Sequence, residues 1–221
     1  FLERGQISEV FIHNMKLQSV ERNEKLAAEE QQQATERKNI GFVAVAAGEG
    51  MKKILESLGV DVVVSGGQTM NPSTKDLLDA VERVNADAVI ILPNNSNIIM
   101  AAQSAAGLAS VPCAVVPTKS VPAAFSALFG ANEEASLEEN VAAMTEAFAD
   151  TKTGEVTTAI KDSKDAHDNP IREGDVIGIA DGSIEAVGSS VEDVVMSLLE
   201  AMEADDADTL TLLAGEGYTD E

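Results

Sequence analysis

From Gly41 onward, short apolar runs alternate with segments of helical periodicity, and this alternation constrains the fold more than any other feature. The runs are apolar at every position, unlike strands that leave one face in water. Strands buried on both faces are typical of a parallel sheet whose crossover helices cover both sides. The sequence therefore predicts an α/β lobe with a parallel, Rossmann-like sheet. The runs are FVAVAA, DVVVS, DAVIILP and PCAVVPT, which begin at residues 42, 61, 87 and 112.

Each apolar run is followed by residues whose apolar side chains recur at helical spacing. After the first run, Met51, Ile54, Leu55 and Leu58 line one face before Gly59 ends the helix. The same pattern predicts three further helices. They lie around Leu77 to Val84, over 98–108 and over 121–129.

The pattern changes after residue 131, and a second α/β lobe with a mixed or antiparallel sheet is expected over 132–221. Its signals include helices over 137–149 and 191–202 and the half-exposed strand pattern GEVTTAIKDS. VIGIADG and SIEAVG predict a hairpin across Asp181 and Gly182. TLTLLAG, over 209–215, predicts a last strand.

Three domains follow from these changes of pattern. Residues 1–39 are interpreted as the tail of a preceding domain and a polar linker helix, and 40–131 as the parallel lobe. Residues 132–221 are then a second lobe truncated at its C-terminus. The ends of the sequence, Phe1 and Thr219-Asp220-Glu221, lead us to expect an internal piece of a longer protein.

The composition narrows the partners. The net charge is −23, from 38 acidic and 15 basic residues, and such a field repels phosphate backbones and anionic lipid surfaces. Nucleic acid is therefore not expected as a partner; a basic protein surface is, unless the charge serves only solubility. No apolar run reaches the roughly 20 residues of a membrane span. The lone Cys113 cannot form an internal disulfide, which suits a reducing cytoplasm.

Two polar loops follow predicted strands, where ligands of open parallel sheets bind. Glycines allow close approach, and backbone amides with hydroxyls suit a carboxylate or phosphate. The alternative is that these residues only turn the chain and cap the next helix. The candidate binding residues are Gly66, Gly67, Gln68, Thr69, Asn71 and Ser73 in the first loop, and Asn94, Asn95, Ser96 and Asn97 in the second.

Motifs for catalysis or metal binding are missing from the sequence. GEG at 48–50 is only a fragment of a dinucleotide fingerprint, and no P-loop pattern occurs. His13 and His167 are far apart and stand with a single cysteine, so no zinc site is expected. We predict no catalytic residue, no metal ligand and no cofactor in this chain.

Several sequence blocks resemble the C-terminal part of the ATP-binding subunit of bacterial fatty acid kinase, a dihydroxyacetone-kinase-like protein with a DegV-like C-terminal domain. GQISEVFIHNMKLQ resembles the end of the middle domain of that family. The NPST and PNNSN blocks, in this order after strands, are the most specific. The other blocks are FVAVAAGEGM, VVPTKSVPAAFSAL, IREGDVIGIADG and LTLLAGEG.

The resemblance implies that the parent protein is an ATP-dependent kinase that phosphorylates a fatty acid carried by a separate DegV-like protein. Mg-ATP would belong to an N-terminal domain outside this chain. The chain itself would dock the acyl carrier and help organise the enzyme, as a homodimer among other arrangements, in the cytoplasm. Whether this fragment has any enzymatic activity of its own stays open.

The resemblance also leaves a rival role, a DegV-like site for an acyl or phosphorylated anion. Acyl-binding relatives hold a carboxylate with the hydroxyls of a T-S-Q-P-S loop, and Thr69 and Ser73 keep those hydroxyl positions. The second, Ser-rich loop of those relatives is replaced by Asn95-Ser96-Asn97. The rival site would use Thr69, Ser73 and Asn95.

Overall fold

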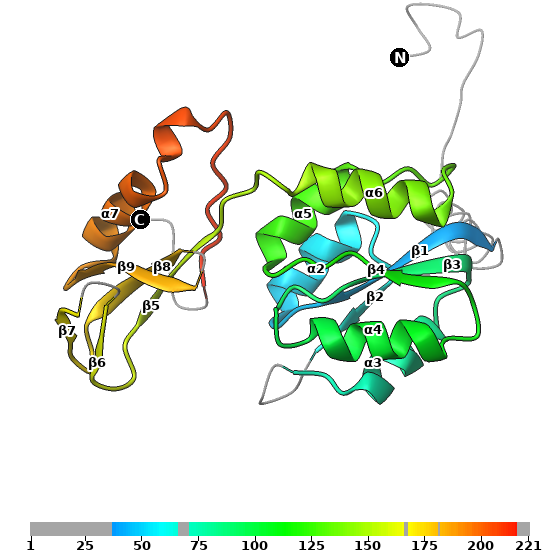
Figure 1. Cartoon of the computed structure of the whole chain (residues 1–221), viewed down its shortest axis with the longest axis horizontal. Helices are drawn as coiled ribbons and strands as arrows, with labels where there is room; N and C mark the ends of the chain where they lie inside the picture. Colours follow the sequence, from blue (N-terminus) through cyan, green and yellow to red (C-terminus); the bar gives the residue numbers. More distant parts are fainter. Residues whose placement is uncertain (1–36, 66–70, 166–167, 181, 216–221) are drawn as a thin grey trace, which may run out of the picture.

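The structure, a computed structural model, describes residues 37–65, 71–165, 168–180 and 182–215, which form two lobes (Figure 1). The first lobe comprises β1 (Lys38–Val45), α2 (Glu49–Ser57), β2 (Val62–Val64), α3 (Thr74–Val81), β3 (Ala86–Leu92), α4 (Ile99–Leu108), β4 (Cys113–Val115), α5 (Val121–Phe129) and α6 (Leu137–Ala147). The second comprises β5 (Gly154–Thr158), β6 (Ser163–Lys164), β7 (Pro170–Ile171), β8 (Val176–Ala180), β9 (Ser183–Gly188), α7 (Val191–Ala201) and a 3-10 turn, η2 (Ala204–Asp206).

The first lobe is built on a parallel sheet with the strand order β2-β1-β3-β4. Val43 of β1 pairs with Val62 of β2 on one side and with Ile91 of β3 on the other. Cys113 of β4 pairs with Val89 of β3, which leaves β2 and β4 as the two edges. The predicted parallel sheet is confirmed.

Successive side chains of these strands enter two different cores, because strand side chains alternate between faces. Phe42, Ala44 and Ile90 contribute to the core that α2, α5 and α6 cover. Val43 and Ile91 contribute to the core that α3 and α4 cover. Helices on both faces explain why the strands are apolar at every position (Figure 1).

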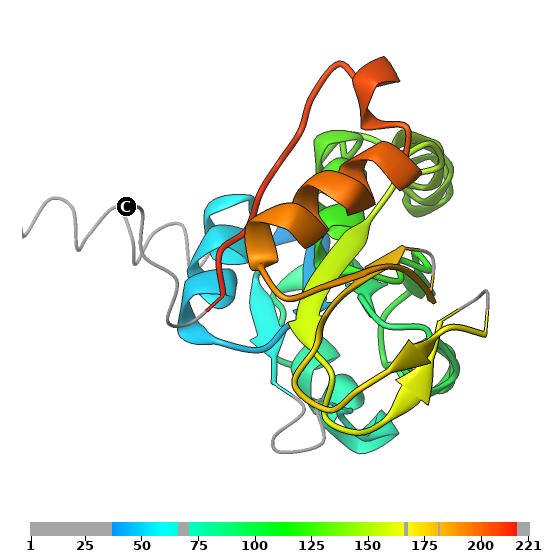
Figure 2. The same cartoon turned by 90° about the vertical axis from the view of Figure 1, so that its left-hand side faces the viewer.

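The second lobe is an antiparallel sheet with the order β5-β8-β9 and one helix, α7, packed against it (Figure 2). Ala180 pairs with Ser183, so the hairpin predicted across Asp181 and Gly182 is confirmed. Val194 and Leu198 of α7 form a small core with Ala186. The cores of this lobe are smaller than those of the parallel lobe, so less apolar burial stabilises it.

Two features of the second part of the chain differ from the expectations. Helix α6 lies after residue 131, where the second lobe was expected to begin, yet Met144 is buried in the core of the parallel lobe. The strand predicted over 209–215 is wrong: these residues form no strand, and Leu210 and Leu212 are exposed. A strand requires a neighbour for its ladder of hydrogen bonds, and no described strand pairs with this segment.

The strand order also fixes where a functional site can lie. Crossovers leave β1 in one direction and β3 in the other, so the loops after these strands diverge at the carboxyl end of the sheet. Such a divergence is the usual ligand position in open α/β sheets. The second polar loop, 93–98, follows β3 at this point. None of the described helices is long and apolar enough to span a membrane.

Candidate functional site

The two polar loops predicted as binding sites both follow strands at the carboxyl end of the parallel sheet. Gly66, Gly67, Gln68 and Thr69 of the first loop lie outside the described residues. The remainder of that loop, from Asn71, and the whole second loop are described.

Ser73 is the N-cap of α3, and its hydroxyl is engaged there. Its Oγ accepts a hydrogen bond from the Asp76 N–H at 3.2 Å and donates one to the Asp76 carboxylate at 2.7 Å. The same carboxylate accepts the Ser73 N–H at 2.9 Å, which completes a capping box. The Ser73 hydroxyl, followed by its N–H, lowers the pKa of Asp76. An anion at Ser73 would have to displace, and approach, a carboxylate.

Asn94 is the structural centre of the second loop. It is only 9% exposed and has a left-handed backbone with φ 58°, which Asn adopts more readily than most residues. Its Nδ2 donates to the Val45 carbonyl oxygen at 2.9 Å, and its Oδ1 accepts from the Thr118 hydroxyl at 2.7 Å. Its N–H donates to the Thr118 Oγ1 at 3.2 Å. The Asn94 side chain therefore connects the ends of β1, β3 and β4 instead of facing a ligand.

The other three residues of the second loop lie further out. The Asn95 Oδ1 accepts the Asn97 N–H at 2.9 Å and so forms a local turn. Ser96 and Asn97 are exposed, and no hydrogen bond of either side chain to a described residue is found. We refer to residues 94–97 as the Asn rim: Asn94 anchors it from inside, and Ser96 and Asn97 present polar groups outward.

The hollow beside the Asn rim is small. It has a volume of about 80 Å³ and is lined by residues from the ends of β1 and β3 and the start of α5. Ligand sites for small molecules usually measure about 300–1,000 Å³. The hollow does not accommodate an acyl chain or a phosphorylated metabolite. Its lining residues are Val45, Ala46, Ala47, Pro93, Asn94, Asn95, Ile98 and Val121.

Thr118 was not predicted as part of the site, although it is fully buried and bonded to Asn94. A signal for it exists in the sequence, since Thr118 follows β4 at the same end of the sheet as Asn94 follows β3. Two polar residues at the ends of adjacent parallel strands can meet, and only the strand order shows that β3 and β4 are adjacent.

Cys113 lies half-buried on the edge strand β4, and burial raises the pKa of its thiol to about 11. The thiol therefore stays protonated at neutral pH and is a poor nucleophile. Within the described residues, no group of three or more His, Cys, Asp and Glu side chains lies close enough to hold a metal ion. His13 and His167 lie outside the described residues.

Comparison with known proteins gives a consistent result. Residues 41–221 match the FakA-like C-terminal family of fatty acid kinase. Protein YloV of Bacillus subtilis (strain 168) is 40% identical over 98% of this chain. An uncharacterized protein of Staphylococcus aureus (strain MRSA252) is 36% identical over 96% of it, and one of Staphylococcus haemolyticus (strain JCSC1435) is 35% identical over 99%.

The chain covers only 39%, 38% and 40% of the lengths of these three relatives. Their similarity therefore extends over nearly all of this chain but over about two-fifths of each relative. The family match over 41–221 agrees with the two-lobe α/β fold, and the chain belongs to the FakA-like C-terminal family of fatty acid kinase.

Proposed function

We propose that this chain docks a fatty-acid-carrying, DegV-like partner protein for a fatty-acid-kinase-type enzyme. Phosphoryl transfer and its Mg-ATP then belong to the part of the parent protein outside this chain. Membership of the FakA-like C-terminal family supports the proposal, as does the fact that the relatives are more than twice as long. No catalytic or metal-binding role is assigned to residues of this chain.

The observation that carries the proposal is the division of labour within the Asn rim. Asn94 is held by Val45 and Thr118, so the rim has a fixed shape before any partner arrives. Ser96 and Asn97 are exposed on this fixed support and are available to a partner. Pre-organised surface groups favour association because less conformational entropy is lost on binding.

The rival role, binding of an acyl or phosphorylated anion, fits the same loops less well. The hollow of about 80 Å³ is too small, and the Ser73 hydroxyl is already bonded to the Asp76 carboxylate. Docking needs no such hollow, because protein interfaces combine surface groups over larger and flatter areas. A net charge of −23 also favours a basic protein surface over an anion.

Isothermal titration calorimetry of the 221-residue chain against a fatty-acid-loaded, DegV-like binding protein tests the proposal. We expect saturable binding that the double variant Ser96→Lys, Asn97→Lys weakens at least about tenfold, or about 1.4 kcal/mol. The matched control is Gln103→Lys, Ser104→Lys, which adds the same charge to exposed positions of α4. Absence of binding by the folded chain, or equal weakening by both double variants, would overturn it.

A further inference from the structure

The outer edge of β4 carries backbone groups that no described residue satisfies. The Val89 N–H donates to the Pro112 carbonyl oxygen at 2.9 Å, and the Val116 N–H donates to the Ile91 carbonyl oxygen at 3.1 Å. Because successive residues of a strand point their backbone groups to opposite sides, Cys113 and Val115 direct theirs away from β3. No strand among the described residues pairs with this side of β4.

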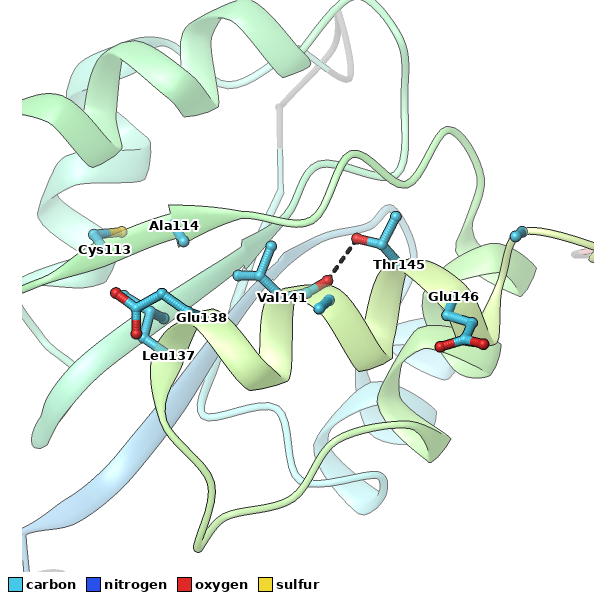
Figure 3. A pocket seen from close by; sticks show the side chains of 9 residues that line it. Cys113, Ala114, Leu137, Glu138, Val141, Thr145 and Glu146 are labelled. Atoms are coloured by element: carbon cyan, nitrogen blue, oxygen red, sulfur yellow. Dashed lines mark hydrogen bonds between the residues drawn. The ribbon is translucent and has the colours of Figure 1, made fainter.

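A groove runs along the same edge, between β4 and α6 (Figure 3). It has a volume of about 760 Å³, and its central wall is formed by Ala114, Val141 and Ala142. Glu138 and Glu146 line it as well, and neither makes an ion pair with a described residue. The remaining lining residues are Cys113, Leu137, Thr145 and Ala149.

From the open edge and the groove together, we propose that β4 accepts an extended segment of a partner protein as an additional strand. Main-chain hydrogen bonds would form to Cys113 and Val115, and alternate side chains of the segment would enter the groove. Pro112 and Pro117 lie on either side of this stretch and lack N–H groups, so the added ladder is short.

The two carboxylates define the charge pattern of the segment. Glu138 and Glu146 are eight residues apart on α6, which corresponds to about 12 Å along the helix. In an extended chain, side chains on one face that are four residues apart are separated by about 13 Å. A segment with basic residues at its first and fifth positions, and an apolar residue between them over Val141, therefore matches the groove.

Charge also separates this occupant from two others. Pairing of two copies of this chain through β4 would bring the Glu138 and Glu146 carboxylates of both copies together, and the groove has no basic lining residue to offset them. A fatty acid in the groove would place its own carboxylate beside the same side chains. A basic extended segment is the occupant that these charges attract.

The test uses fluorescence anisotropy with the intact chain and the labelled synthetic peptide Thr-Lys-Thr-Leu-Thr-Lys-Thr. We expect saturable binding that falls with added salt, and at least about tenfold weaker binding of the same peptide with Glu in place of both Lys residues. Glu138→Lys with Glu146→Lys should reverse this preference. Both side chains are exposed, so this double variant is expected to fold.

A backbone variant tests the strand itself. Val115→Pro removes the outward N–H without removing a bond to β3, and should weaken peptide binding at least about tenfold. Val115→Ala keeps that N–H while losing more of the side chain, and should change binding less than about threefold. Thermal unfolding establishes that both variants fold.

Three results would overturn the inference. They are the absence of peptide binding by the wild-type chain, equal binding of the Lys and Glu peptides, and unchanged binding by a folded Val115→Pro variant. A dimer in sedimentation velocity that Val115→Pro dissociates would also overturn it, because a second copy would then occupy the edge.

Discussion

The Asn rim and the outer edge of β4 belong to the same sheet, but they differ in what their polar groups contact. In the rim, polar side chains are numerous, and the central one, Asn94, is bonded to Val45 and Thr118 inside the fold. At the β4 edge the side chains are apolar, and the backbone groups of Cys113 and Val115 face away from the sheet. The comparison teaches that a polar sequence can serve structure while an apolar one leaves hydrogen-bonding groups open.

The largest effect that would sharpen this comparison is expected at Asn94. Asn94→Ala leaves the Val45 carbonyl and the Thr118 hydroxyl without partners, and each buried unsatisfied group costs roughly 1–3 kcal/mol. We expect a loss of about 3 kcal/mol in the free energy of unfolding, measured by urea denaturation followed by circular dichroism.

Two variants control that measurement. Asn94→Gly accepts the φ of 58° without strain but also lacks the amide, so most of the loss should remain. Val141→Ala, in the half-buried wall of the groove, should cost about 1 kcal/mol or less. Equal costs for Asn94→Ala and Val141→Ala would break the distinction between the two regions.

Thr118 should show the next largest effect. Thr118→Val keeps the shape of the side chain but removes the hydroxyl that donates to the Asn94 Oδ1, and it should cost about 2 kcal/mol. Thr118→Ser keeps the hydroxyl and should cost clearly less. If Ser and Val substitutions destabilise the chain equally, packing of the Thr118 methyl group matters here and the hydrogen bond does not.

The N-caps of α3 and α6 should show smaller and similar effects, because one helix begins beside the rim loops and the other beside the groove. Ser73→Ala and Ser136→Ala each remove a capping hydroxyl and should cost about 1 kcal/mol in urea denaturation. A negligible cost for Ser73→Ala alone would indicate that Ser73 is kept for a ligand, which would favour the rival anion site.

The same two caps predict the smallest effect, a dependence of stability on acid. Hydrogen bonds from Ser73 and Ser136 lower the pKa of Asp76 and Glu139 from ordinary values of 3.8 and 4.5. A lowered pKa means that the unfolded chain binds protons first, so this stability is present above pH 4.5 and is lost as the pH falls through the lowered pKa values.

Between about pH 5 and 3 the urea midpoint should therefore fall less for Asp76→Asn with Glu139→Gln than for the wild-type chain. Glu82, whose pKa is lowered by hydrogen bonds from Ser110, remains in both proteins and gives the residual slope. A double variant with an unchanged slope would show that the two carboxylates do not contribute through their caps.

The parallel lobe was predictable from sequence because its strands and helices carry strong local patterns. The predicted bounds of α5, 121–129, agree with the structure, and the hairpin of β8 and β9 was expected from Asp181-Gly182. The absence of a strand at 209–215 was not predictable, because a strand depends on a distant neighbour that local patterns cannot supply.

The site was less predictable than the fold. The sequence identified the Asn rim by composition, but it did not show that Asn94 faces inward onto Thr118, 24 residues away. It also contained no signal for the β4 edge, because strand order and the position of α6 decide which backbone groups stay open.

The central claim, docking at the Asn rim, is tested most directly by amide hydrogen exchange of the chain with and without the fatty-acid-loaded DegV-like partner. Docking at the rim predicts slower exchange in the peptides that cover residues 93–98, with smaller changes across α7 of the second lobe. Saturating partner with unchanged exchange at 93–98, or protection confined to the second lobe, would contradict it.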